Sequence, residues 1–189
     1  NESFQYSFDF FSIIAVAMLF GTWLISRPLM IKLAGEEFAA SGPILDVLII
    51  ATAGIFFGTL LIYLIVAIDA QRQMIKYFMW SAIVALIGYF VFIPIYSYWG
   101  AAYMTLVVEW LIVLFAWRVI KKNIDLNISF KVFYKSLLAG ILSFSLAWMF
   151  RSYNIVVVFS LALLLYFIIL TGLKTIGRGQ LKKIFLNKS

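Results

Sequence analysis

Long apolar runs, separated by short polar turns, are the feature that most constrains the fold of this chain. A bilayer core of about 30 Å requires roughly 20 apolar residues in an α-helix, because each residue adds about 1.5 Å. We expect six segments to be long enough for a crossing, and they cover residues 8–25, 43–68, 74–95, 100–120, 136–150 and 155–173. The first is expected to end at Arg27-Pro28, because the residue before a proline avoids helical geometry.

The overall composition supports a membrane protein. Hydrophobic residues make up 65% of the 189 residues and charged residues only 12%, whereas a soluble domain is about half apolar and a quarter charged. This excess of apolar side chains cannot be hidden in one globular core. Cysteine and histidine are both absent, which removes thiol chemistry and most zinc and haem sites. We therefore predict an all-α membrane protein with no metal and no cofactor.

The positively charged residues predict the orientation of the helices. If the N-terminus is cytoplasmic, all of the 15 Lys and Arg residues except Arg27, Lys32 and Arg151 fall on the cytoplasmic side. Cytoplasmic loops carry such an excess of cations in membrane proteins. The prediction is an up-down bundle of six transmembrane helices over residues 1–175, with both termini in the cytoplasm and a basic cytoplasmic tail at 176–189. The chain begins at Asn1, with no initial methionine and no signal-peptide pattern, so we expect more chain before it.

One acidic residue lies far from the predicted helix ends. Glu109 follows Gly100 by nine residues, which places it about 13 Å along its helix, close to the middle of the bilayer. An ionised carboxylate there costs at least about 2.5 kcal/mol, so Glu109 is expected to face the bundle interior or a water-filled cavity, or to be protonated. Thr105 lies one turn earlier on the same face. Two interpretations stay open: a cavity or ion-coupling residue, and a neutral acid hydrogen-bonded to a neighbouring helix.

Two further patterns concern cations and small residues. Cations gather at the predicted inner ends of the second, third and fourth segments, and they are Arg72, Lys76, Arg118, Lys121 and Lys122. They could contact an anionic lipid headgroup or a pyrophosphate, although topology alone is the simpler explanation. Small residues recur every four positions, as Gly54 and Gly58 in one segment and as Ala139, Ser143 and Ala147 in another. Such spacing allows close helix contacts, but chance explains it about as well.

An ordered set of short motifs surrounds the junction of the third and fourth segments. Its residues are Ile93, Pro94, Tyr96, Gly100, Ala101, Ala102, Thr105 and Glu109. The set resembles the polysaccharide flippases of the multidrug/oligosaccharidyl-lipid/polysaccharide exporter superfamily. Their C-terminal halves often carry an Ile-Pro helix end, a tyrosine-glycine turn, a Gly-Ala-Ala start, a small or hydroxyl residue and an acid. Residues 33–38 and 67–73 resemble an external element and an inner turn of the same family. Ser97 departs from the pattern where the family usually has glycine, and Ala34 where it usually has an aromatic residue.

This resemblance implies that the chain is the second six-helix bundle of a flippase and works with an N-terminal half. The implied substrate is an oligosaccharide on an undecaprenyl pyrophosphate carrier, flipped across the bacterial cytoplasmic (inner) membrane for O-antigen, capsule or other surface polysaccharide synthesis. Membrane lipids and a polysaccharide polymerase are implied partners, and nucleic acid is not. Glu109 and Thr105 would line the cavity, and Arg72, Lys76 and Arg118 would contact the headgroup at the inner mouth.

Two other classes of function compete with this one. A cation-coupled small-molecule or drug exporter of the same superfamily would also use an acid in the middle of the membrane. A membrane-embedded enzyme would need a base, often histidine, or clustered acids near the membrane surface. The chain has no histidine and its acids are dispersed, so we expect a transporter and no catalytic residues.

Overall fold

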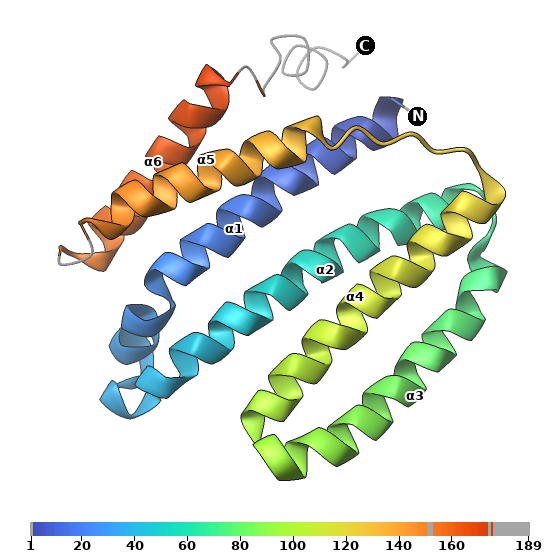
Figure 1. Ribbon diagram of the computed structural model, residues 1–189, viewed down its shortest axis with the longest axis horizontal. Helices are drawn as coiled ribbons and strands as arrows, with labels where there is room; N and C mark the ends of the chain where they lie inside the picture. The colour runs from blue at the N-terminus through green and yellow to red at the C-terminus, as the bar shows by residue number, and fades with distance from the viewer. Residues whose placement is uncertain (1, 151–152, 174, 176–189) are drawn as a thin grey trace. The chain divides into compact units, whose positions relative to one another are not determined.

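The computed structural model describes residues 2–150, 153–173 and 175 (Figure 1). Every regular element in this part of the chain is helical, as the sequence predicts. The elements are α1 (Glu2–Ala34), the short 3-10 helix η1 (Glu36–Ser41), α2 (Gly42–Ala67), α3 (Gln71–Tyr96), α4 (Tyr98–Asn123), α5 (Lys131–Trp148) and α6 (Ile155–Gly172). The predicted basic tail at 176–189 lies outside the described residues.

Five helical segments are long and apolar enough to cross a membrane. They are α1, η1 together with α2, α3, α4 and α6, and they indicate a multi-pass membrane protein. Helix α5 does not reach the same apolar character, although the sequence predicts a crossing there. It begins at Lys131 rather than at Ser136, so that Lys131 and Lys135 lie inside the helix. Its 18 residues include two lysines and three serines, and it is not among the five segments that are apolar enough to cross.

The expected end of the first crossing at Arg27 is wrong. Helix α1 continues through Pro28 to Ala34 and ends at Gly35, which has a φ of 100°. A proline removes one backbone hydrogen bond and restricts the preceding residue. In an apolar environment, however, the backbone groups of a broken helix find no water to replace their partners, so continuing the helix past a proline is favoured. Gly35 then supplies the positive φ that other residues avoid.

The chain divides into two compact units, which we describe separately. Unit 1 spans Ser26–Ile128, and in it α4 lies between α2 and α3, which hardly touch each other (Figure 1). Gly54 and Gly58 both face α4: a Cβ at Gly58 would lie 3.6 Å from Val113. The predicted contact through the GxxxG pair is therefore confirmed. Gly54 lies at Glu109, and Gly58, one turn later on α2, lies at Val113, one turn later on α4. The helices α2 and α4 therefore run in the same direction.

Unit 2 contains Glu2–Ile25 and the described residues from Ser129 to 175, so the first part of α1 packs with α5 and α6. The small residues of α5 form its buried face, and Ala139 and Ala147 are fully buried. A Cβ at Gly140 would lie 3.0 Å from Cγ1 of Val16 on α1. The predicted small-residue contact of this helix is confirmed. The hydroxyl of Tyr166 on α6 donates a hydrogen bond of 2.9 Å to the Ile13 carbonyl, which ties α6 to α1.

A tight turn joins α3 to α4 in unit 1. Ser97 is its single linking residue and has a φ of 53° and a ψ of −133°, a conformation that glycine adopts far more easily than serine. The amide of Ser97 donates a 2.7 Å hydrogen bond to the Ile93 carbonyl, and the Gly100 amide donates a 3.1 Å bond to the Ser97 carbonyl. These two hydrogen bonds close the turn. The backbone strain of the turn is located at Ser97, because this residue has the positive φ.

Replacing Ser97 by glycine should stabilise the protein by about 1 kcal/mol, because the change relieves an L-residue held at positive φ. Ser97 makes no side-chain capping bond to α4, so no hydrogen bond at the helix start is lost. The measurement is the midpoint of thermal unfolding in detergent micelles. Ser145→Gly, at an exposed position inside α5, is the matched control and should lower stability. A loss of stability in both variants would contradict the strained turn.

Candidate functional site

Glu109 lies at the contact between α4 and α2. A Cβ added to Gly54 of α2 would lie 3.3 Å from the Glu109 Cβ and 3.3 Å from the indole nitrogen of Trp110. Because Gly54 has no side chain, Glu109 and Trp110 of α4 can pack closely against the α2 backbone at this position. Glu109 is half-buried. Its side chain begins at a helix–helix contact, as expected for an acid that avoids lipid.

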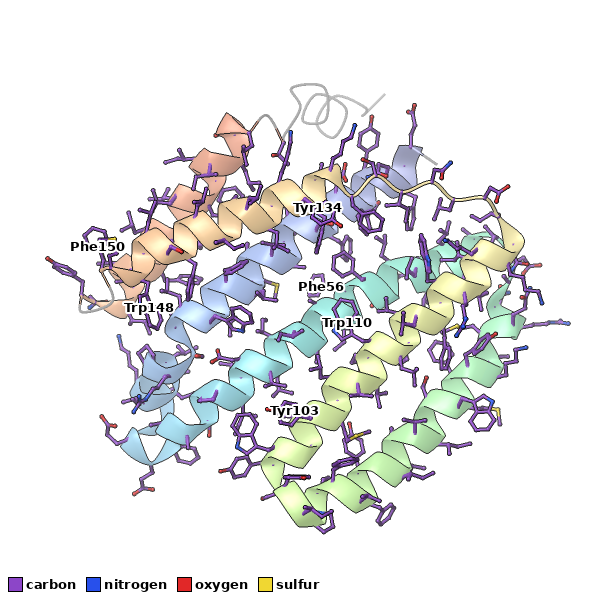
Figure 2. The ribbon with its side chains drawn as sticks, viewed as in Figure 1. Phe56, Tyr103, Trp110, Tyr134, Trp148 and Phe150 are labelled. Carbon is purple, nitrogen blue, oxygen red and sulfur yellow. The ribbon has the colours of Figure 1, made fainter. Side chains whose placement is uncertain are left out.

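The neighbours of Glu109 are aromatic and backbone groups. The indole N–H of Trp110 donates a 3.1 Å hydrogen bond to the Ile50 carbonyl, one turn before Gly54 on α2 (Figure 2). This bond fixes the rotation of α4 against α2, and with it the direction in which Glu109 leaves its helix. Among the described residues, the Glu109 carboxylate has no hydrogen-bond or ion-pair partner. It is an acid at an apolar helix contact, and its role in a cavity or in ion coupling stays a prediction.

Thr105 points to a different neighbour. Its hydroxyl donates a 2.9 Å hydrogen bond to the Ala101 carbonyl and lies 3.0 Å from the hydroxyl of Tyr89 on α3. Four residues advance an α-helix by slightly more than one turn, and α4 is flanked by α2 on one side and α3 on the other. The two residues therefore differ slightly in direction around α4. Thr105 contacts Tyr89 of α3, whereas Glu109 lies beside Gly54 of α2. The two residues are close along α4 but do not share a partner.

The predicted inner-mouth cations lie at one end of unit 1. Arg72 and Lys76 belong to the first two turns of α3, Arg118 lies near the end of α4, and all three are exposed. The side-chain amides of Gln73 and Asn123 hold these helix ends together through bonds of 3.0 and 3.3 Å. The structure thus brings the cations of both helices to the same end, as the sequence predicts, and about 13 Å along α4 from Glu109.

Sequence reasoning missed a buried polar cluster in unit 2. Asp9 is only 8% exposed, and the amide nitrogen of Gln5 donates a 2.8 Å bond to its carboxylate. Gln5 also bonds both backbone groups of Ser129, each at 2.9 Å, so it fastens the chain before α5 to α1. Asp9 is not among the site residues expected from the sequence. Its spacing of four residues from Gln5 was the available signal, since such pairs meet on a helix.

A second missed acid lies in unit 1. Asp46 is hydrogen-bonded to Ser26 of α1 and is half-buried. Gly42 lets these segments approach closely, because a Cβ there would lie 2.7 Å from the Arg27 Cα. Asp46 therefore connects α2 to the last part of α1. No sequence spacing reveals this contact, since it depends on the helix continuing past Pro28.

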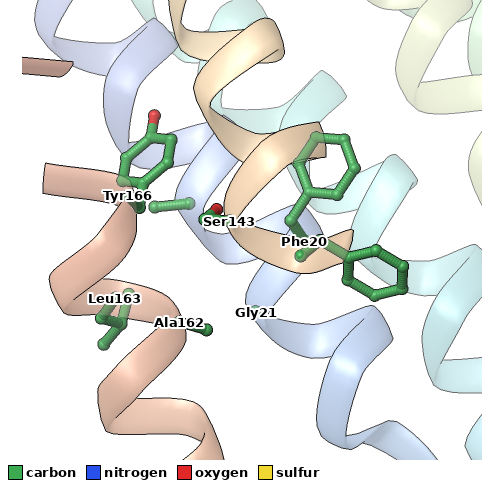
Figure 3. Close-up of a pocket in the computed structure, with 8 residues that line it drawn as sticks. Phe20, Gly21, Ser143, Ala162, Leu163 and Tyr166 are labelled. Carbon is green, nitrogen blue, oxygen red and sulfur yellow. The ribbon is translucent and has the colours of Figure 1, made fainter. Parts of the chain in front are cut away.

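A small pocket in unit 2 is separate from all of these residues. It is lined by Ala17, Phe20, Gly21, Ser143, Phe144, Ala162, Leu163 and Tyr166 (Figure 3). The lining comes from α1, α5 and α6 and is mostly apolar. None of the site residues expected from the sequence lines it. In the described part of the chain, no three His, Cys, Asp or Glu side chains gather as metal ligands would.

Two arrangements therefore stand out as candidate sites. One is the carboxylate of Glu109 at the α2–α4 contact, and the other is the set of exposed cations where α3 begins and α4 ends. Neither can be assigned through known proteins: no family model, no curated protein and no solved structure matches this chain.

Proposed function

We propose that this chain is a six-crossing half of a transporter that flips undecaprenyl-pyrophosphate-linked oligosaccharide repeat units across the bacterial cytoplasmic membrane. In this proposal all six helices cross up-down, α5 included, and both termini lie in the cytoplasm. The observation that carries it is the Glu109 carboxylate, half-buried in the middle of α4 and set against Gly54 of α2. The ordered motifs around the α3–α4 turn support the same family of transporters.

The chemistry of the substrate explains why such an acid is useful. A sugar headgroup carries many hydroxyl donors, which need acceptors while they cross an apolar layer. A carboxylate accepts several hydrogen bonds at once, and the Tyr89–Thr105 hydroxyl pair lies one turn away on the α3 side. The lipid tail of the carrier stays in the bilayer and needs no polar path. Glu109 would therefore contact the sugar portion or carry a proton during the cycle.

The pyrophosphate needs cations that this region of the helices does not supply. In the described spans, the cations lie near helix ends, and Arg72, Lys76 and Arg118 are the nearest set on α3 and α4. We assign the mid-membrane phosphate contacts to the N-terminal half of the transporter. The polysaccharide polymerase that receives the flipped unit is the further partner in this proposal.

A second candidate is a cation-coupled exporter of small organic cations. It is favoured by the aromatic surroundings of the acid, since Trp110 directly follows Glu109 and its indole nitrogen also lies beside Gly54. A carboxylate beside an indole ring suits a cationic ligand, through charge attraction and cation–π contact.

Reconstituting the whole transporter in proteoliposomes separates the two candidates. One assay follows translocation of a lipid-linked oligosaccharide, and a parallel assay follows gradient-driven uptake of a fluorescent organic cation. We expect oligosaccharide translocation well above that of empty liposomes and no cation uptake. Cation uptake without oligosaccharide translocation would replace the proposal with the exporter.

A further inference from the structure

A set of cations, which we call the basic end, lies where α3 begins and α4 ends in unit 1. Its members are Arg72, Lys76, Arg118, Lys121 and Lys122, and all are exposed. The Gln73–Asn123 amide pair holds the two helix ends together, so the cations of both helices stay at one place. The chain has a net charge of +7, which makes an anion the complementary ligand for this surface.

Aromatic rings hold part of the basic end at the edge of the apolar helix surface. The Lys76 ammonium lies 5.2 Å from the centre of the Tyr77 ring, and the Lys121 ammonium 5.3 Å from that of Trp117. Tyr77 in turn stacks on Phe115 of α4 at 4.8 Å. These cation–π contacts hold the two lysine side chains against the aromatic rings. Tyrosine and tryptophan are enriched at the level of the lipid headgroups in membrane proteins.

The two arginines remain available for a ligand. Arg72 and Arg118 are exposed, and neither forms a hydrogen bond or an ion pair with another described residue. A guanidinium presents paired N–H donors that match two oxygens of a phosphate, which an ammonium cannot do. The basic end therefore offers two guanidinium groups without a partner among the described residues, beside three further cations.

An apolar surface continues directly from the basic end along α3. Ile75, Met79 and Leu86 are 57%, 62% and 59% exposed, and their spacing places them along one side of the helix. Within unit 1, α3 packs mainly on α4, which leaves this side without a partner there. A ligand with a phosphate at one end and apolar chains at the other matches both surfaces at once.

We propose that the basic end binds the phosphate headgroup of an anionic membrane phospholipid, with its acyl chains along the exposed side of α3. The site lies at the helix ends, roughly 13 to 20 Å along α4 from Glu109. It is therefore separate from the acid that carries the proposed transport function, and it does not depend on that function. Clustered cations near membrane-spanning helices bind anionic lipids in this way, each contributing roughly fivefold in affinity.

Lipid titration of the purified full-length protein in detergent tests this proposal. Binding of phosphatidylglycerol is compared with binding of phosphatidylcholine carrying the same acyl chains, by mass spectrometry of the intact complex. The variant Arg72→Gln/Arg118→Gln is compared with Lys32→Gln/Lys131→Gln, which removes the same charge at exposed positions outside the basic end. We expect phosphatidylglycerol to bind more tightly than phosphatidylcholine, and the arginine variant to lose at least tenfold of that affinity while the lysine variant keeps it.

Three results would overturn the proposal. Equal binding of the two lipids would show that the headgroup charge is not recognised. Equal losses in the arginine and lysine variants would show a general effect of net charge. Displacement of phosphatidylglycerol by inorganic pyrophosphate at equal concentration would identify a site for a free anion, in which the apolar side of α3 takes no part.

Discussion

Replacing Glu109 by glutamine should reduce translocation of the lipid-linked oligosaccharide by roughly tenfold to a hundredfold while the protein still inserts and folds. Glutamine has the same shape and keeps the packing against Gly54 and Trp110, but it is neutral and cannot titrate or attract a cation. A tenfold to hundredfold loss corresponds to about 1.4 to 2.8 kcal/mol of transition-state stabilisation, which is comparable to the roughly 1.5 to 3 kcal/mol of a hydrogen bond to a charged group. The measurement is the initial rate of translocation in proteoliposomes containing equal amounts of protein.

Asp125→Asn is the matched control, because it removes an exposed acid from the chain between α4 and α5. It should leave the rate unchanged. A wild-type rate in Glu109→Gln would remove this acid from the transport cycle. Glu109→Leu with unchanged stability and unchanged rate would go further and place the side chain on an inert surface.

Replacing Gly100 by alanine should destabilise the protein by about 3 kcal/mol or more, which is a large effect for one methyl group. A Cβ at Gly100 would overlap the carbonyl oxygen of Phe92 and lie 2.5 Å from its carbonyl carbon and 3.0 Å from the Ile93 nitrogen. All three are backbone atoms of α3, so no side chain can rotate away, and the two helices must separate. The measurement is the thermal unfolding midpoint in micelles.

The control for this change is Gly172→Ala, at the end of α6, where an added Cβ would meet nothing within 4 Å. Its stability should stay within about 0.5 kcal/mol of the parent protein. If Gly100→Ala unfolds at the same temperature as this control, then α3 and α4 do not approach as closely as the structure shows. The Tyr89–Thr105 contact, which depends on the same approach, would then be lost as well.

Much of the fold could be predicted because apolar runs in a membrane leave few alternatives to a helix. The small residues of α5 and the Gly54–Gly58 pair of α2 also indicated correctly which helix faces make close contacts. In both helices, the spacing of small residues along the sequence is enough to predict the face that makes the close contact. For Glu109, the free-energy penalty for exposing an acid to lipid favours a position against a neighbouring helix, and its Cβ lies at the contact with α2.

The remaining features depend on packing that no local pattern records. Whether Pro28 ends α1 is decided by the competition between a local steric preference and the cost of unpaired backbone groups in lipid. Thr105 and Glu109 separate because α4 lies between two helices, and the sequence alone does not show which helix flanks which side. The bonds from Gln5 to the Ser129 backbone join residues that are far apart in the chain, and only the packed structure brings them together.

Cysteine accessibility at position 109 tests most directly whether a translocation path passes Glu109. The chain contains no native cysteine, so Glu109→Cys introduces a single thiol into this chain. We expect a membrane-impermeant maleimide to label it in intact membranes, and we expect the lipid-linked oligosaccharide to block that labelling. A thiol at position 109 that reacts only with lipid-soluble reagents, and equally with and without the oligosaccharide, would contradict a transport path at this residue.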